Sequence, residues 1–185
     1  GFVLSEGAAV VVIEKLSHAL ARGATPLAIA AGYGTSADAY HLTSGSPDGA
    51  GAQVAMRQAI KMAGLTPDDI GYVNAHATAT EVGDNAETNG IRNLFGDRGQ
   101  SLAVSSTKSA TGHMLGAAGA MEAVISMLAL RNQMLPPTLN LDDPEPVAAQ
   151  FDLVPKVPKP KALKHVLSNS FGFGGVNASL VFSAV

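Results

Sequence analysis

The chain has 185 residues, of which 46% are hydrophobic, so it can bury a substantial core in a single α/β domain and is not a disordered chain. Its formal net charge of −3 leaves no broad basic surface, which argues against nucleic-acid binding. There is no cysteine, and this excludes a disulfide framework and a thiolate metal site. No apolar stretch is long and uninterrupted enough to predict a membrane span.

The N-terminal residues predict two short strands and one helix. Residues 2–4 and 8–13 are apolar runs, and the second is β-branched on both faces, as in a fully buried strand. Residues 14–22 have leucines at helical spacing and end before Gly23, which predicts a short helix. The sequence begins within an apolar segment and without methionine, so we expect it to be a fragment of a longer protein.

The middle of the chain alternates between strands and helices. A buried strand is expected at residues 27–31, and a long irregular loop at residues 32–51. An amphipathic helix over residues 53–63 follows, and then a strand over residues 70–75 that places His76 at its carboxyl end. This order favours a mostly parallel sheet covered by helices.

Acidic and basic residues mark the next two helices. Asp84 and Glu87 have the spacing of an acidic signal at the start of a helix. After a strand that ends near Ser105, a polar cluster precedes an apolar run over residues 114–130, which predicts a core helix contacted on most sides. Glu122 on that helix is costly to bury without a partner, and Lys108 is the natural one. A purely structural ion pair is the alternative.

The last third of the sequence predicts a proline-rich connection and a hairpin. Seven prolines between residues 136 and 160 exclude a long helix or a central strand there. Strands are expected at residues 163–168 and 178–182, joined by the segment NSFGFGGVN. The glycines of this segment predict a tight turn with Phe171 and Phe173 at its rim.

Three of the predicted strands are followed by residues that can bind a ligand or take part in catalysis. In open α/β sheets, ligands bind at the carboxyl ends of the strands. These residues are His76, then Lys108 with His113, and finally the phenylalanines of the glycine-rich turn. No nucleophile accompanies them, and such a set of donors suits the stabilisation of an oxyanion or enolate. Taken alone, each of these residues could have a purely structural role. His76, for example, could be an ordinary histidine at the end of a strand. A metal site that combines the histidines with nearby carboxylates lacks the usual ligand spacings.

The motifs VNAHATAT, SSTKSATGH and NSFGFGGVN, in this order, closely resemble the carboxyl-terminal part of β-ketoacyl-acyl-carrier-protein synthases of the fatty-acid, KAS II-like type. The resemblance implies an α/β, thiolase-like fold of two βαβαβαββ halves. Residues 1–14 would then be the final strands of the amino-terminal half, and residues 15–185 the carboxyl-terminal half.

The same resemblance implies decarboxylative Claisen condensation, with a malonyl group activated by this part of the enzyme. His76 and His113 match the histidines that bind the malonyl thioester carbonyl, and Lys108 matches the lysine that supports them. The other residues that the family motifs suggest are the supporting carboxylates Asp84, Glu87 and Glu122, the pantetheine-binding Thr78 and Thr80, and the acyl-gate residues Phe171 and Phe173. The family's nucleophilic cysteine is absent, so we expect the fragment alone to be inactive.

The resemblance also implies the partners and setting of the complete protein. An acyl carrier protein would present the acyl and malonyl groups, the full-length protein would be a homodimer, and neither a cofactor nor a metal is expected. The bacterial cytoplasm is the expected location, with a mitochondrial or plastid matrix as the alternatives. Ala77, Ala79 and Val176 depart from the family's usual residues, and the first two adjoin the pantetheine threonines. A polyketide-type ketosynthase and a non-catalytic chain-length or scaffold paralogue are the alternative functions.

Overall fold

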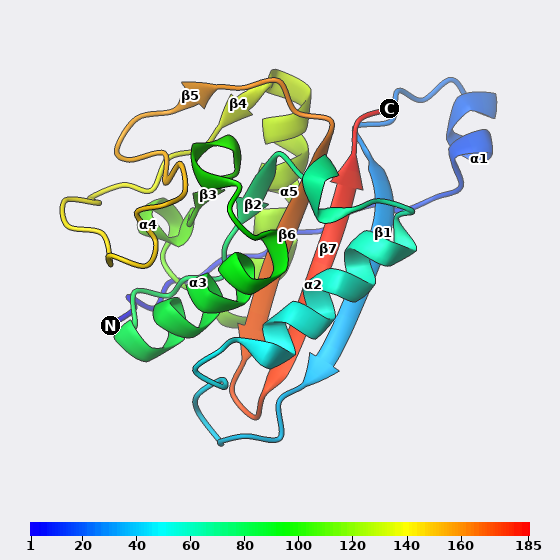
Figure 1. Cartoon of the computed structure of the whole chain (residues 1–185). Coiled ribbons are helices and arrows are strands. Elements are labelled where there is room, and N and C mark those ends of the chain that lie inside the picture. Colours follow the sequence, from blue (N-terminus) through cyan, green and yellow to red (C-terminus); the bar gives the residue numbers. More distant parts are fainter.

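The computed structural model describes residues 1–185 and shows a five-stranded sheet with helices on both faces (Figure 1). The helices are α1 (Leu16–Ala21), α2 (Ala50–Met62), α3 (Glu81–Phe95), α4 (Lys108–Thr111) and α5 (Ala118–Asn132). The strands are β1 (Ile29–Ala37), β2 (Tyr72–Asn74), β3 (Ala103–Ser105), β4 (Met134–Leu135), β5 (Lys159–Pro160), β6 (His165–Gly172) and β7 (Val176–Ser183). Short 3₁₀ turns cover Pro67–Asp69, Gly99–Ser101 and Leu115–Ala117. None of the helices has the length and apolar character that a membrane crossing requires.

The main sheet has the strand order β1-β7-β6-β2-β3, and β4 pairs with β5 in a separate ribbon. The chain therefore follows the βαβαβαββ order that the family resemblance implies. The prediction of a mostly parallel sheet is confirmed for the strand directions, because β1, β6, β2 and β3 run the same way and β7, which is antiparallel to both of its neighbours, is the exception. A tight turn joins β6 to β7, and strands joined in this way must run antiparallel.

Two hydrophobic clusters fill the space on either side of the sheet. Val73 and Val181 belong to the cluster beneath α2 and α3, whereas their neighbours Tyr72 and Phe182 belong to the cluster against α5. This alternation follows from the two-residue period of a strand, whose successive side chains point to opposite faces. The sheet is thereby fixed between two helical layers, and the carboxyl ends of β2 and β3 lie side by side.

Strand β1 is longer than the sequence predicts and includes the first part of the expected loop at residues 32–51. Its apolar pattern is hidden because glycines replace side chains where α2 packs on it. A Cβ atom added at Gly32 would lie 2.2 Å from the carbonyl oxygen of Ala59, and one at Gly34 would lie 2.0 Å from that of Ala55. Only glycine permits so close an approach of helix and strand backbones.

The strands predicted within residues 1–14 do not form. Leu4 makes one isolated bridge with His113, and residues 8–13 extend along the molecule without strand partners. Val10 is 88% exposed and Val12 is 81% exposed, so the prediction of burial is also wrong here. An extended segment becomes a strand only when another strand offers backbone partners, and no strand of this chain does so. The proposed boundary between residues 14 and 15 stays a prediction.

Two helix predictions also need correction. The helix start that Asp84 and Glu87 predict is placed three residues too late, because α3 begins at Glu81, with Asp84 in its first turn and Glu87 beyond it. The apolar run after His113 forms a 3₁₀ turn followed by α5, and it is not enclosed on most sides. Leu115 is 60% exposed and Leu128 is 45% exposed, because the sheet covers only one side of this segment.

Candidate active site

The structure brings His76 and His113 together at the carboxyl ends of neighbouring strands. His76 follows β2, and His113 follows α4, the short helix beyond β3. Their ring centroids are 5.6 Å apart in an edge-to-face arrangement, and the ring of Phe171 lies 5.7 Å from that of His76. All three residues line a cavity of about 680 Å³. One small molecule in this cavity could therefore contact both histidines.

Backbone contacts fix both the placement and the tautomer of His113. Its N–H donates to the carbonyl of Val3 at 2.8 Å, and its carbonyl accepts the N–H of Ser5 at 3.1 Å. The backbone N–H of Leu115 donates to Nδ1 of the ring at 3.2 Å. In the neutral imidazole the proton then resides on Nε2, which makes that atom a hydrogen-bond donor.

The imidazole of His76 is strongly biased toward its neutral form. Burial, followed by charge repulsion from Lys108 and His113, lowers its pKa to about 3. Burial and Lys108 also lower the pKa of His113. Two neutral rings can each donate one hydrogen bond to a single oxygen, without the cost of two adjacent cations.

Lys108 and Glu122 form the buried ion pair that the sequence predicts. Lys108 is 8% exposed and Glu122 is 2% exposed, and the ammonium donates to Oε1 of the carboxylate. Burial raises the pKa of Glu122 to about 7, although Lys108 favours the charged form. Neither residue lines the cavity, so Lys108 acts on His76 through its charge.

Glu87 and Asp84, both on α3, have different surroundings. Glu87 accepts the backbone N–H of His76 at 2.9 Å and that of Ala77 at 2.8 Å, so it contacts the histidine segment rather than the ammonium of Lys108. Burial raises the pKa of Glu87. Asp84 does not line the cavity, and burial followed by repulsion from Glu87 raises its pKa to about 6.

The threonines and phenylalanines line the same cavity as the histidines. The hydroxyls of Thr78 and Thr80 are hydrogen bonded to each other at 3.2 Å, and both residues line the cavity. Ala79 between them has a φ of 62°, an uncommon conformation for a residue with a side chain. Phe173 also lines the cavity and is 72% exposed on the turn between β6 and β7, as predicted for a residue at the rim.

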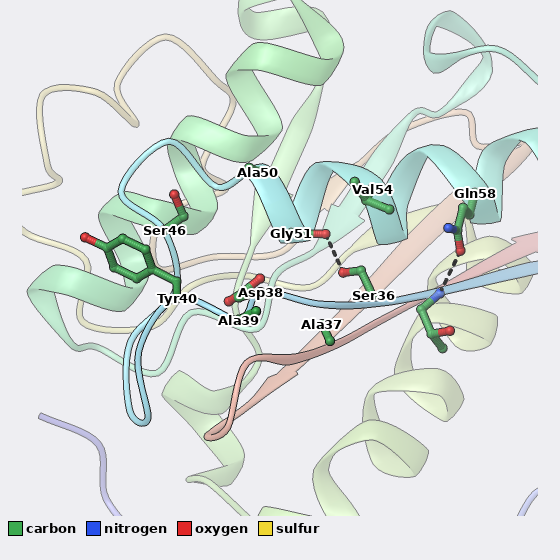
Figure 2. A pocket seen from close by; sticks show the side chains of 11 residues that line it. Ser36, Ala37, Asp38, Ala39, Tyr40, Ser46, Ala50, Gly51, Val54 and Gln58 are labelled. Carbon is green, nitrogen blue, oxygen red and sulfur yellow. Dashed lines mark hydrogen bonds between the residues drawn. The ribbon is translucent and has the colours of Figure 1, made fainter.

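Figure 2 shows a second cavity, of about 500 Å³, between the end of β1 and the start of α2. Ser36 donates to the carbonyl of Gly51 at 2.7 Å, and the backbone N–H of Thr35 donates to Gln58 at 3.2 Å. Asp38 lines both cavities and accepts a hydrogen bond from Asn177 at 2.6 Å. Asp38 lies in the segment predicted as a long irregular loop, and no role was predicted for it.

No three His, Cys, Asp or Glu side chains are arranged in the structure so that they could hold a metal ion.

The family model described as beta-ketoacyl synthase, C-terminal domain, matches residues 27–142. The chain belongs to the beta-ketoacyl synthase family. Within this family, 3-oxoacyl-[acyl-carrier-protein] synthase 2 of Vibrio cholerae is 52% identical over 184 residues, which are 98% of this chain and 44% of the relative.

Solved ketosynthase structures share the fold. The structure of the ishigamide ketosynthase/chain length factor is similar to this chain, with a TM-score of 0.94 and 35% sequence identity. The match covers 100% of this chain and 45% of the matched chain in that structure. A second match is the AntDE:AntF complex, in which a type II polyketide acyl-carrier protein is bound to its ketosynthase with the hexaketide. The match covers 93% of this chain and 42% of the matched chain in that complex. Its TM-score is 0.89 and the identity is 34%. The thiolase-like fold is thereby confirmed, and this beta-ketoacyl synthase chain spans less than half the length of these relatives.

Proposed function

We propose that this chain provides the malonyl-activating half of a 3-oxoacyl-acyl-carrier-protein synthase, which extends acyl chains in fatty acid biosynthesis. The observation that supports this most is the pair of histidine rings, 5.6 Å apart, at the wall of one cavity. A malonyl thioester has one carbonyl oxygen on which negative charge develops during decarboxylation, and two convergent N–H donors suit that oxygen.

In the proposed step, the bond between the malonyl carboxylate and its α-carbon breaks, and carbon dioxide leaves. The electron pair moves to the thioester oxygen, which His76 and His113 hold as an enolate. The α-carbon of the enolate then attacks an acyl thioester on a cysteine, and the acyl–sulfur bond breaks. The chain has no cysteine, so the nucleophile must come from another part of the complete protein.

An acyl carrier protein is the proposed partner, as in the AntDE:AntF complex. Thr78 and Thr80 are the proposed contacts for its pantetheine arm, because their hydroxyls lie at the wall of the cavity that contains the histidines. We further propose that the complete protein is a homodimer. The Vibrio cholerae relative favours a bacterial source, for which the cytoplasm is the proposed location.

A polyketide-type ketosynthase and a non-catalytic chain-length partner are the competing functions. The solved polyketide and chain-length relatives are 34% and 35% identical, whereas the Vibrio cholerae synthase is 52% identical, which favours the fatty-acid type. A scaffold needs neither a histidine pair in a cavity nor the buried Lys108–Glu122 pair beside it.

The test is to incubate the complete protein with acyl and malonyl carrier proteins and to measure 3-oxoacyl product. Residues 1–185 alone should form none, and addition of the half that bears the cysteine should restore product formation. A fragment that forms 3-oxoacyl product unaided would contradict the proposal, because it would contain a nucleophile other than cysteine.

A further inference from the structure

The ring of His76 has no side-chain partner that orients it. Its Nδ1 atom is buried and makes no hydrogen bond within the protein. The ring contacts two other rings, those of His113 and Phe171, and these limit its tilt without fixing a hydrogen-bond direction. The direction of the ring must therefore come mainly from the backbone at residues 76 and 77.

Hydrogen bonds hold that backbone on both sides. The carboxylate of Glu87 accepts the N–H of His76 and the N–H of Ala77, one with each oxygen. On the other side, the hydroxyl of Ser106 donates to the carbonyl of Ala77 at 2.8 Å. Two consecutive amides on one carboxylate fix the orientation of the peptide plane, and with it the Cα–Cβ direction of His76.

Glu87 is in turn held by side chains of β6 and β7. Asn169 donates from Nδ2 to Oε1 of Glu87 at 3.0 Å, and Ser179 donates from its hydroxyl to Oδ1 of Asn169 at 2.8 Å. Asn169 and Ser179 face each other across the β6–β7 pair. Both are 0% exposed and Glu87 is 4% exposed, so water does not compete with these contacts. Glu87 forms no salt bridge, and its charge is met by these N–H donors.

We propose that Asn169 and Ser179 are positioning residues for His76 and act on it through Glu87. The proposal rests on the proposed function, because it assigns them to the malonyl-activating step. The serine hydroxyl fixes which end of the Asn169 amide faces Glu87, so that the NH₂ group donates to the carboxylate. The relay runs from β7 through β6 and α3 to the end of β2, and β7, β6 and β2 are adjacent in the sheet (Figure 1).

The decisive variant is Asn169→Asp, which keeps the shape of the side chain but places an acceptor against Glu87. It should lower kcat for malonyl decarboxylation by the complete protein by about tenfold to a hundredfold, as expected for a small misplacement of a catalytic group. KM for malonyl carrier protein should stay within about twofold, because the wall of the binding cavity is unchanged. Hydrogen exchange should rise at the amides of residues 76 and 77 and not in the rest of the sheet.

Ser179→Ala should produce a smaller decrease in kcat, and Ser179→Thr, which keeps the hydroxyl, should restore it. The matched control is Ser126→Ala, because Ser126 is also 0% exposed but its hydroxyl makes no hydrogen bond within the protein. This control should retain the original kcat. If Asn169→Asp does not fold, the three serine variants still decide the question.

Malonyl decarboxylation by the His76→Ala variant, measured in the same assay, distinguishes the proposed function from the proposed positioning role. If His76→Ala leaves decarboxylation unchanged, the proposed function itself fails. If His76→Ala abolishes decarboxylation while folded Asn169→Asp and Ser179→Ala proteins keep the original kcat, only the positioning role is overturned. A decrease in kcat that is matched by equal losses in acyl transfer, or by faster exchange throughout the sheet, would also overturn it.

Discussion

The ammonium of Lys108 donates to the carboxylate of Glu122 inside the protein, with both side chains at most 5% exposed. Lys108 precedes α5 and Glu122 lies within it, so the pair ties the polar segment that contains His113 to the core helix. Two buried charges are expensive to desolvate, and their attraction offsets that cost only while both are present. The pair thus makes the stability of this region sensitive to either residue.

Replacement of Lys108 by methionine should lower the free energy of unfolding by about 3–5 kcal/mol, because it leaves the Glu122 carboxylate buried without a cation. Chemical denaturation of the complete protein measures this loss. The additional change Glu122→Gln should recover much of it, since the double variant buries no charge.

The exposed pair of Lys156 and Asp142 offers a matched control, because their side chains are 55% and 75% exposed. Lys156→Met should change the free energy of unfolding by at most about 1 kcal/mol, as is usual for exposed ion pairs. Equal losses for Lys108→Met and Lys156→Met would show that the buried pair has no special effect on stability.

The lowered pKa of His76 predicts an unusual response to pH. A folded-state pKa of about 3 keeps the ring neutral between about pH 5 and pH 8, whereas an ordinary histidine titrates near 6.5. Between about pH 3 and 6.5 the unfolded chain therefore binds a proton that the folded chain does not. This histidine lowers the free energy of unfolding as the pH falls through that window. NMR titration of the labelled ring tests the prediction, and a midpoint near 6.5 in the folded protein would contradict it.

Phe173 should be a mobile gate at the cavity. It lies in a turn with Gly174 and Gly175, whose φ angles are 84° and 78°, and two backbone hydrogen bonds connect this turn to residues 38 and 42. Glycine lowers the barrier to backbone rearrangement, so the turn can open for an acyl chain. Structures with and without a bound acyl group should show two conformers of residues 172–175. A fixed turn in both states, together with an unchanged acylation rate in Phe173→Ala, would rule out gating.

Much of the site could be predicted from the sequence because its elements are locally encoded. His76 and the segment with Lys108 and His113 follow short apolar runs, and parallel strands bring such ends to one edge of the sheet. The partner of Glu122 was predictable from the cost of its burial. The glycines after Phe171 correctly predicted a tight turn.

Other features depend on contacts that no local pattern shows. The full length of β1 could not be predicted, because Gly32 and Gly34 are typical of a loop in the sequence. In the structure they are the strand residues that α2 approaches closely. The Asp84 and Glu87 spacing matched a helix start, yet Glu87 contacts the amides of residues 76 and 77 in another element. The role of Asn169 also depends on strand register, which places it opposite Ser179.

The most direct test of the central claim is malonyl decarboxylation by the complete protein with His76→Ala or His113→Ala. Each change removes one of the two donors to the developing enolate, so each should lower kcat by about 100- to 1,000-fold. Transfer of an acyl group to the cysteine should continue, because that step does not form the enolate. Decarboxylation at the original rate in both variants, or loss of acyl transfer alone, would contradict the assignment of this chain as the malonyl-activating half-site.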